Sequence, residues 1–105
     1  MSWFYLIIAG IFEIGWPLGL KLSQTMATKL PGIIIAAVAM SFSGLFLWLA
    51  QKSIPIGTAY AVWTGIGATG TLLVGILFFG DSASIGRMLS ASLIIIGIIG
   101  LKLFN

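Results

Sequence analysis

The 105-residue sequence contains neither cysteine nor histidine. The absence of cysteine excludes a disulfide framework and thiol chemistry. The absence of histidine removes the commonest metal ligand and the side chain that most often titrates near neutral pH. Because no base–nucleophile pair and no set of metal ligands is visible either, we expect no enzyme, no metal site and no cofactor.

Charged residues are also scarce, at 7% of the chain, whereas 60% of the residues are hydrophobic. A soluble domain carries roughly 25% charged residues, so this composition indicates a protein whose solvent is the lipid bilayer. The five basic residues are well separated, as is typical of anchors at the membrane surface: Lys21, Lys29, Lys52, Arg87 and Lys102. Nucleic-acid binding needs a clustered basic patch, so we expect no nucleic-acid partner.

Four long apolar segments separated by short polar ones predict an all-α membrane protein with four transmembrane helices per protomer. The helices are expected over approximately residues 3–21, 30–51, 55–79 and 84–103. Together they form a single transmembrane domain, residues 1–105. The polar run 23–29 is expected to be the first loop. The second loop, residues 52–55, is short, so the helices on either side of it should be antiparallel neighbours.

One carboxylate lies within the first apolar segment. Glu13 follows Trp3 by ten residues, which at about 1.5 Å per residue is roughly 15 Å, half of a hydrocarbon core about 30 Å thick. A carboxyl group at that depth costs several kcal/mol unless it is paired, neutral or in contact with water. Glu13 is therefore either a protonated structural residue bonded to another helix or a binding site for a cation and for protons. We favour the binding site, because acidic residues within membranes usually mark such pathways.

Small residues recur at helical spacing on two segments. Gly57, Ala61 and Gly65 repeat every four residues on the third segment, and Ser90 and Gly97 are one heptad apart on the fourth. Such residues let a second helix approach closely, and that helix can belong to the same chain or to a second copy. Four helices can hardly enclose a cavity with two gates, so we expect a homodimer.

The charges at the segment ends indicate how the chain inserts. With a cytoplasmic N-terminus, Lys52 and Lys102 lie inside, whereas Lys21, Lys29 and Arg87 lie outside. Two cations against three is almost no bias under the positive-inside rule. We therefore expect the chain to insert in both orientations.

Three segments resemble a known family. They read AGIFE at 9–13, followed by Trp16 and Lys21, then PIGTAYAVWTGIGA at 55–68, and GIIGLK at 97–102. These segments resemble the first, third and fourth helices of the small multidrug resistance family, and the resemblance covers essentially the whole chain. The run WTGIG at 63–67, with Trp16 and Lys21, looks most like the guanidinium exporters of that family.

This resemblance implies an antiparallel, dual-topology homodimer in the inner (plasma) membrane, which exchanges protons for a cation by alternating access. It places the site that binds substrate and protons at Glu13, Trp16, Ser43, Tyr60 and Trp63. Ser41 remains an alternative to Ser43. Pro17 stands where many relatives have alanine, and it could widen the cavity and loosen substrate selection.

The side chains suit this chemistry. A guanidinium presents forked N–H donors that a carboxylate accepts in pairs. Two Glu13 side chains in one cavity would repel each other if both were ionised, so protons and the cation would compete for the same oxygens. Trp16 can orient Glu13 through its indole N–H. Tyr60 can donate a hydrogen bond to Glu13 or belong to an aromatic belt, and Trp63 can face a cation or simply pack.

The sequence thus predicts proton-coupled export of guanidinium and small guanidinyl cations. A broad exporter of hydrophobic quaternary ammonium cations is the alternative within transport. A structural membrane subunit without transport is the alternative outside it. Glu13 argues against such a subunit, because a protein that only packs has no use for an acid in mid-membrane.

Overall fold

Four helices make up nearly the whole chain in the computed structural model, which describes residues 1–25 and 27–104. They are α1 (Ser2–Thr25), α2 (Leu30–Ala50), α3 (Ile56–Phe78) and α4 (Ile85–Leu103). Each is long and apolar enough to cross a membrane. The four predicted transmembrane helices are therefore confirmed, and no strand interrupts them in the described residues.

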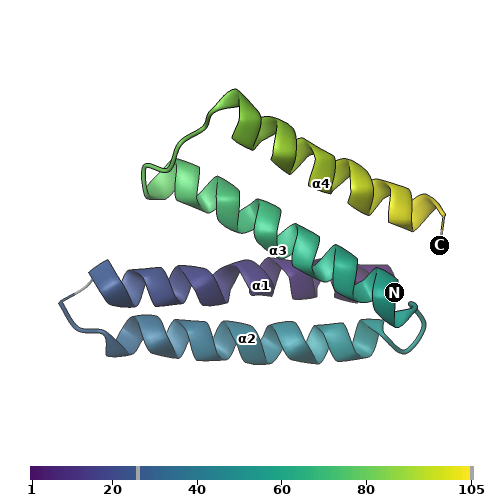
Figure 1. The fold of residues 1–105 in the computed structure, drawn as a ribbon. Coiled ribbons are helices and arrows are strands. Elements are labelled where there is room, and N and C mark those ends of the chain that lie inside the picture. Colours follow the sequence, from purple (N-terminus) through teal and green to yellow (C-terminus); the bar gives the residue numbers. More distant parts are fainter. Residues whose placement is uncertain (26, 105) are drawn as a thin grey trace.

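The helices do not form a closed bundle (Figure 1). α1 and α2 run side by side in opposite directions, and α3 lies across α1 while barely touching α2. The expectation that the short second loop makes α2 and α3 antiparallel neighbours is therefore wrong, because α3 packs on α1 instead. Within the described residues α4 packs mainly against α3, and Lys102 near its end reaches Trp3 of α1. The protomer is thus a three-helix unit, α1 to α3, with α4 attached to one side.

Small residues allow α1 and α2 to approach closely. A β-carbon on Gly19 would lie 2.6 Å from the backbone nitrogen of Ala36 and 2.7 Å from the carbonyl oxygen of Gly32. One on Gly32 would lie 2.5 Å from the backbone nitrogen of Ser23. Apolar surface gains little from leaving lipid, so membrane helices associate through this kind of close backbone packing.

The first helix is longer than the sequence predicts. The polar run suggests a loop from residue 23, but residues 23–25 form the last turn of α1. The hydroxyl of Ser23 donates to the carbonyl oxygen of Leu20 at 2.6 Å, and that of Thr25 donates to Leu22 at 3.2 Å. These polar side chains are satisfied by the helix itself, so they do not end it. Met26, in the same polar run, lies outside the described residues. The other predicted helix ends agree with the structure to within one residue.

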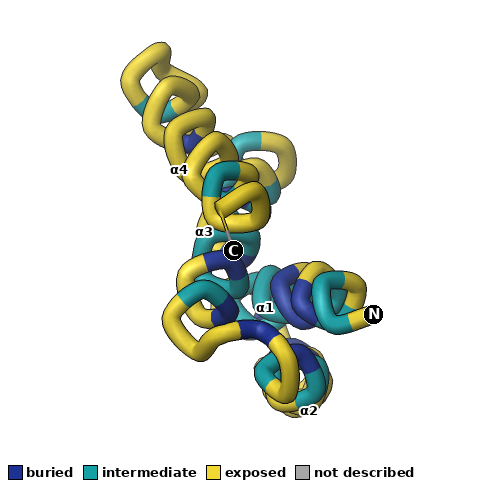
Figure 2. Tube along the Cα trace, turned by 90° about the vertical axis from the view of Figure 1, so that its right-hand side faces the viewer, coloured by how far each residue is buried: buried dark blue, intermediate teal, exposed yellow. Residues whose placement is uncertain are grey.

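α4 is almost entirely uncovered in the protomer. Ala91 is its one buried residue, and Figure 2 shows exposed positions along nearly its whole length. Its large apolar side chains include Leu89, Leu93 and Ile96, each more than 60% exposed. A helix with this much bare apolar surface fits lipid, a second copy of the chain, or both.

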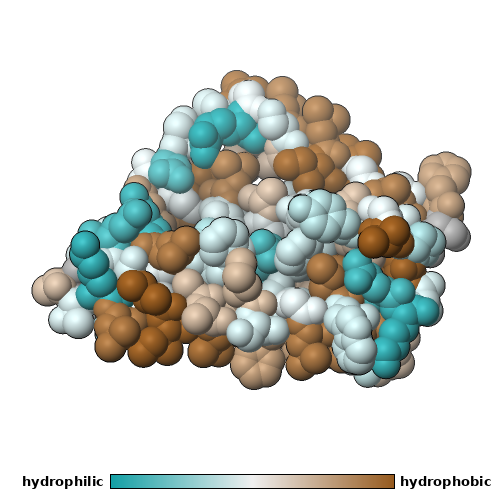
Figure 3. Space-filling view, turned by 60° about the horizontal axis from the view of Figure 1, so that its bottom comes forward, coloured by the Kyte–Doolittle hydropathy of each residue, from teal (hydrophilic) through white to brown (hydrophobic). Residues whose placement is uncertain are grey.

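The outer surface divides into an apolar middle and polar ends. Figure 3 shows hydrophobic residues over much of one face and hydrophilic ones gathered toward its edges. At one end, the Lys52 ammonium lies 4.6 Å from the ring centre of Trp48, and Lys102 lies 5.8 Å from that of Trp3. Such Lys–Trp pairs suit the membrane–water boundary, where an amphipathic ring and a cation are both stable.

The close approach of α1 and α2 makes a testable prediction about Gly19. The substitution Gly19→Ala should lower the free energy of unfolding by about 1–3 kcal/mol, because the added methyl forces the two backbones apart. Gly44→Ala is the matched control, since a methyl there meets nothing within 4 Å. Denaturant unfolding in detergent micelles, followed by circular dichroism, measures both. Equal stability of the two variants would contradict the packing described.

Candidate cation-binding site

Glu13 lies half-buried near the middle of α1, which continues as a helix through Pro17. Proline has no backbone N–H, so the carbonyl of Glu13, four residues earlier, loses its usual helical donor. The helix therefore presents an acidic side chain and an acceptor carbonyl at the same level. Both favour ligands that bring hydrogen-bond donors.

Each oxygen of the Glu13 carboxyl group has a neighbouring donor. The indole Nε1–H of Trp16, one turn away on α1, donates to Oε1 at 2.6 Å. The hydroxyl of Ser43 on α2 lies 3.2 Å from Oε2. The carboxyl group is thereby fixed in one orientation without a basic partner.

Ser43 connects three helices. It is fully buried, and its hydroxyl lies 2.8 Å from the carbonyl oxygen of Ala9 on α1. The indole Nε1–H of Trp63 on α3 donates to the same hydroxyl at 2.8 Å. A hydroxyl has a single hydrogen, so Ser43 can donate to Ala9 or to ionised Glu13, but not to both at once.

Gly67 brings α3 against the carboxylate. A β-carbon at this position would lie 2.5 Å from Cγ of Glu13. Only glycine leaves room for the acid beside the α3 backbone, and neighbouring Gly70 does the same for Ile14. Gly67 and Gly70, in the middle of α3, therefore allow its close approach to α1.

The other side of Glu13 is open. A cavity of about 500 Å³ reaches from the acid along α3 to the loop before α4. Its lining residues are Glu13, Pro17, Thr64, Gly67, Ala68, Thr71, Leu72 and Asp81. The residues of α3 in this set are three or four positions apart, so they share one face of the helix. That spacing could have identified Thr71 from the sequence, whereas Asp81 depends on the fold of the loop.

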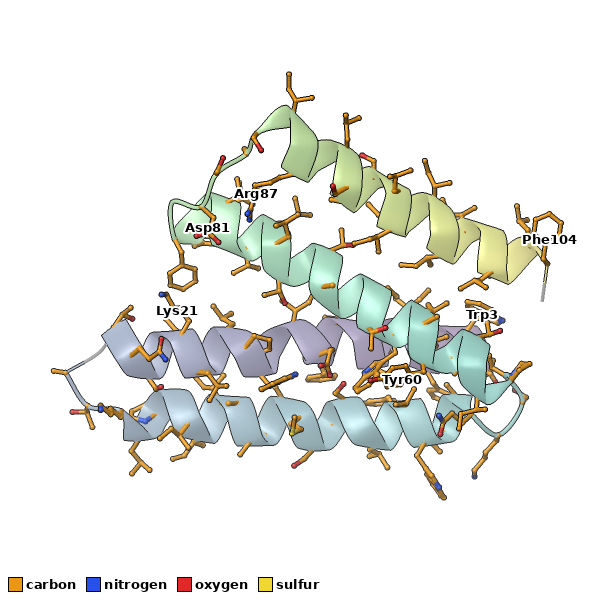
Figure 4. All side chains as sticks on the ribbon, in the orientation of Figure 1. Trp3, Lys21, Tyr60, Asp81, Arg87 and Phe104 are labelled. Carbon is orange, nitrogen blue, oxygen red and sulfur yellow. The ribbon has the colours of Figure 1, made fainter. Side chains whose placement is uncertain are left out.

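The five predicted site residues fall into two groups. Glu13, Trp16, Ser43 and Trp63 form one continuous hydrogen-bonded chain. Tyr60 lies outside it, 57% exposed, with its ring centre 5.4 Å from that of Trp63 and tilted by 54°. Within the described residues its hydroxyl makes no hydrogen bond to Glu13. Figure 4 shows it on α3, toward the end at which Trp3 lies.

The structure distinguishes Ser43 from Ser41. Ser41 is exposed on α2, and its hydroxyl donates to the carbonyl oxygen of Ala37 in its own helix at 2.8 Å. Ser43, two residues on, faces Glu13. Of the two serines, only Ser43 has the position that the candidate site needs.

The predicted packing residues also divide. Gly65 packs within the protomer, since a β-carbon there would lie 2.9 Å from Cδ1 of Ile98 on α4. Gly57 and Gly97 have open space around them, and Ala61 and Ser90 are exposed. Ser90 also lines a groove between α3 and α4 of the same chain. At Gly57 and Gly97 the open space leaves room for a helix of another molecule.

The site residues supply groups that can bind a proton or a cation. The described residues hold no group of three or more His, Cys, Asp or Glu side chains that could bind a metal ion. What they supply is a carboxylate, hydroxyl groups and aromatic rings beside a cavity. Such a set can hold a proton or a cation that carries N–H donors.

Known proteins match this chain over nearly its whole length. The model of a family described as Small Multidrug Resistance protein matches residues 1–103. A guanidinium exporter from Yersinia pseudotuberculosis is 54% identical over 103 residues, which cover 98% of each chain. One from Salmonella typhimurium is 50% identical over 103 residues, 98% of this chain and 97% of its own. With its four membrane-spanning helices, the chain belongs to the small multidrug resistance family, whose members are multi-pass proteins of the inner membrane in bacteria.

Proposed function

We propose that the protein exports guanidinium and small guanidinyl cations and exchanges them for protons at Glu13. One observation carries this proposal: the carboxyl group is held by Trp16 and Ser43 on one side and faces a cavity of about 500 Å³ on the other. The related exporters are named for the same substrate. The protein is then a transporter and not an enzyme.

Guanidinium suits this site because it is small, flat and rich in N–H groups. A carboxylate accepts two parallel N–H bonds from such an ion. Thr64 and Thr71, which line the cavity, offer hydroxyl oxygens as further acceptors. A quaternary ammonium ion has no N–H donor, so it would gain only from charge and apolar contact.

Coupling to protons follows from competition for the same oxygens. A proton on Glu13 removes the negative charge that attracts the cation, and a bound cation excludes the proton. The Ser43 hydroxyl can adapt to either state of Glu13, because it has a single hydrogen that can rotate. It can donate this hydrogen to the carbonyl oxygen of Ala9 when Glu13 is protonated, and to the carboxylate when Glu13 is ionised. The carboxyl group thereby keeps hydrogen-bond partners in both states.

The complete transporter is, in this proposal, a homodimer. The cavity beside Glu13 has walls from α1 and α3 and the loop before α4, and a second copy would close it. The exposed α4 and the open space at Gly57 and Gly97 provide surface for that copy. Two Glu13 residues would then face one shared cavity.

The two copies are antiparallel in this proposal. Lys52 and Lys102 pair with tryptophans at one end of the protomer, and Lys21 and Arg87 lie at the other (Figure 4). Because basic residues lie at both ends, the positive-inside rule gives little preference for either orientation in the membrane. One sequence can then supply both orientations, and the same site faces each side of the membrane in turn.

The central test is Glu13→Gln. The amide has the same shape but cannot titrate, so proton-driven guanidinium transport in proteoliposomes should fall to background while the protein stays folded. Tetrapropylammonium, measured in parallel, distinguishes the proposed exporter from one for quaternary cations. Robust proton-driven guanidinium uptake by this variant would overturn the role of Glu13, and failure of the native protein to carry guanidinium would overturn the proposed function.

Topology is tested by adding two lysines to the loop between α2 and α3. The added charge should hold that loop in the cytoplasm, so every copy has one orientation and transport by this variant alone is lost. A partner chain with the opposite charge bias should restore transport on co-expression. If the variant with the two added lysines is fully active on its own, the antiparallel dimer is ruled out.

Ser43→Ala tests how the site selects its substrate. Loss of one hydrogen bond, on the order of 1 kcal/mol, should reduce guanidinium transport about five-fold more than transport of tetrapropylammonium. Ser41→Ala is the matched control, because its hydroxyl bonds only within α2. Equal losses for both cations would mean that the orientation Ser43 gives to Glu13 does not favour cations with N–H donors.

A further inference from the structure

The chain has only two acidic residues, and both line the same cavity. Glu13 lies near the middle of α1, whereas Asp81 lies in the loop between α3 and α4. An exposed acid in a membrane protein has no need to face a cavity, since the surrounding water stabilises its charge. The direction of Asp81 is therefore set by the fold of the loop and not by a need for partners.

Two glycines direct Asp81 toward the cavity. Gly80 has a φ of +72°, a conformation that glycine adopts without strain, and it turns the chain back after α3. The backbone N–H of Asp81 then donates to the carbonyl oxygen of Gly75 at 3.0 Å. The Asp81 carboxylate lies directly over Gly75, where a β-carbon would collide with its Oδ2. The loop thus holds the carboxylate over the last turns of α3.

Two basic residues, Lys21 and Arg87, lie at the same end of the molecule as Asp81. Lys21 of α1 lines an adjoining cavity of about 240 Å³ together with Asp81 and Thr71. Figure 4 shows Asp81 between Lys21 and Arg87 at this end of the molecule. The buried Nε of Arg87 has no hydrogen-bond partner in the part of the chain that the structure describes. Without Asp81, an arriving cation would meet only positive charge here.

We propose that Asp81 is an outer binding position for the transported cation, at the mouth of the cavity that leads to Glu13. The proposal rests on the function proposed above and adds a second place where the substrate binds. The Asp81 carboxylate accepts the N–H donors of the cation and offsets the charges of Lys21 and Arg87. Thr71, which lines both cavities, provides an acceptor on the way from Asp81 to Glu13.

This outer position acts mainly on the arrival of the cation. Asp81 is exposed, so water and salt weaken its attraction. Charge that lines a cleft raises association rates by about ten-fold or more, and one exposed carboxylate should supply somewhat less, about five-fold. The Michaelis constant for guanidinium should therefore depend on Asp81 far more than the maximal transport rate does.

The first experiment measures guanidinium currents of Asp81→Asn in proteoliposomes at low ionic strength. The Michaelis constant should rise about five-fold, with the maximal current within about two-fold of the native value. The difference should shrink in salt on the order of 1 M, where charges are screened within about 3 Å. Ser82→Asn in the same loop is the control. An unchanged Michaelis constant in Asp81→Asn, while the native protein carries guanidinium, would overturn this inference and leave the proposed function intact.

The second experiment distinguishes the effect of where the Asp81 carboxylate lies from the effect of the protein's net charge. Gly75→Ala keeps every charge, but its methyl must displace the flexible end of the Asp81 side chain, which supplies the nearest atoms to that methyl. The Michaelis constant should rise as in Asp81→Asn. Gly86→Ala, at the same end of the molecule with nothing within 4 Å of the added methyl, is the matched control. A native constant in Gly75→Ala would mean that only net charge matters, and the outer position would be wrong.

A binding measurement gives a reading that does not depend on transport or on the folding of Gly75→Ala. In Glu13→Gln, guanidinium chloride should still shift the NMR signal of the Asp81 backbone amide. The shift should disappear in the double variant Glu13→Gln/Asp81→Asn. Loss of the shift already in Glu13→Gln would show that the cation does not bind at Asp81 independently, which contradicts the proposal.

Discussion

An acidic group inside a membrane is stable only while its oxygens have partners, because lipid supplies none. Glu13 meets this requirement through Trp16 on its own helix and Ser43 on α2. Ser43 is in turn positioned by Ala9 and by Trp63 on α3. The need to satisfy one carboxyl group thus determines the relative position of three helices. The remaining helix, α4, takes no part in this network, and it is also the one that the protomer leaves bare.

α3 contributes to the hydrogen bonds around Glu13, to the cavity wall and to the contact with α4. Trp63 reaches the hydrogen-bonded side of Glu13, while the face that includes Thr64, Gly67 and Thr71 forms a wall of the cavity. Gly65 of the same helix packs against Ile98 of α4. A change in how α3 lies against α1 would therefore reach both the ligand cavity and the helix proposed for contact with a second copy.

The sequence was sufficient for the number and approximate limits of the helices, because apolar runs of this length between charged residues can hardly form anything but membrane-spanning helices. It failed for residues 23–25, where hydroxyl groups that look like loop residues bond back to the helix. Within the site, the resemblance to a known family supplied Ser43, but the residues alone did not separate it from Ser41. The choice between the two serines depends on how α2 is rotated about its own axis relative to α1. Because α2 is apolar all round, the periodicity of its sequence does not define that rotation. Asp81 could not have been found, since its direction depends on the positive φ of Gly80 and on the missing side chain of Gly75.

The glycines of α3 have a mechanical consequence. Gly65 faces Ile98 of α4, while Gly67 and Gly70 face Glu13 and Ile14 of α1. A helix surface without side chains has little relief, so a neighbour can slide along it without lifting over interlocked side chains. Small shear movements of packed helices are one of the common ways in which proteins change conformation. At these three positions α3 carries no side chain that would have to pass over Glu13, Ile14 or Ile98 during such a movement.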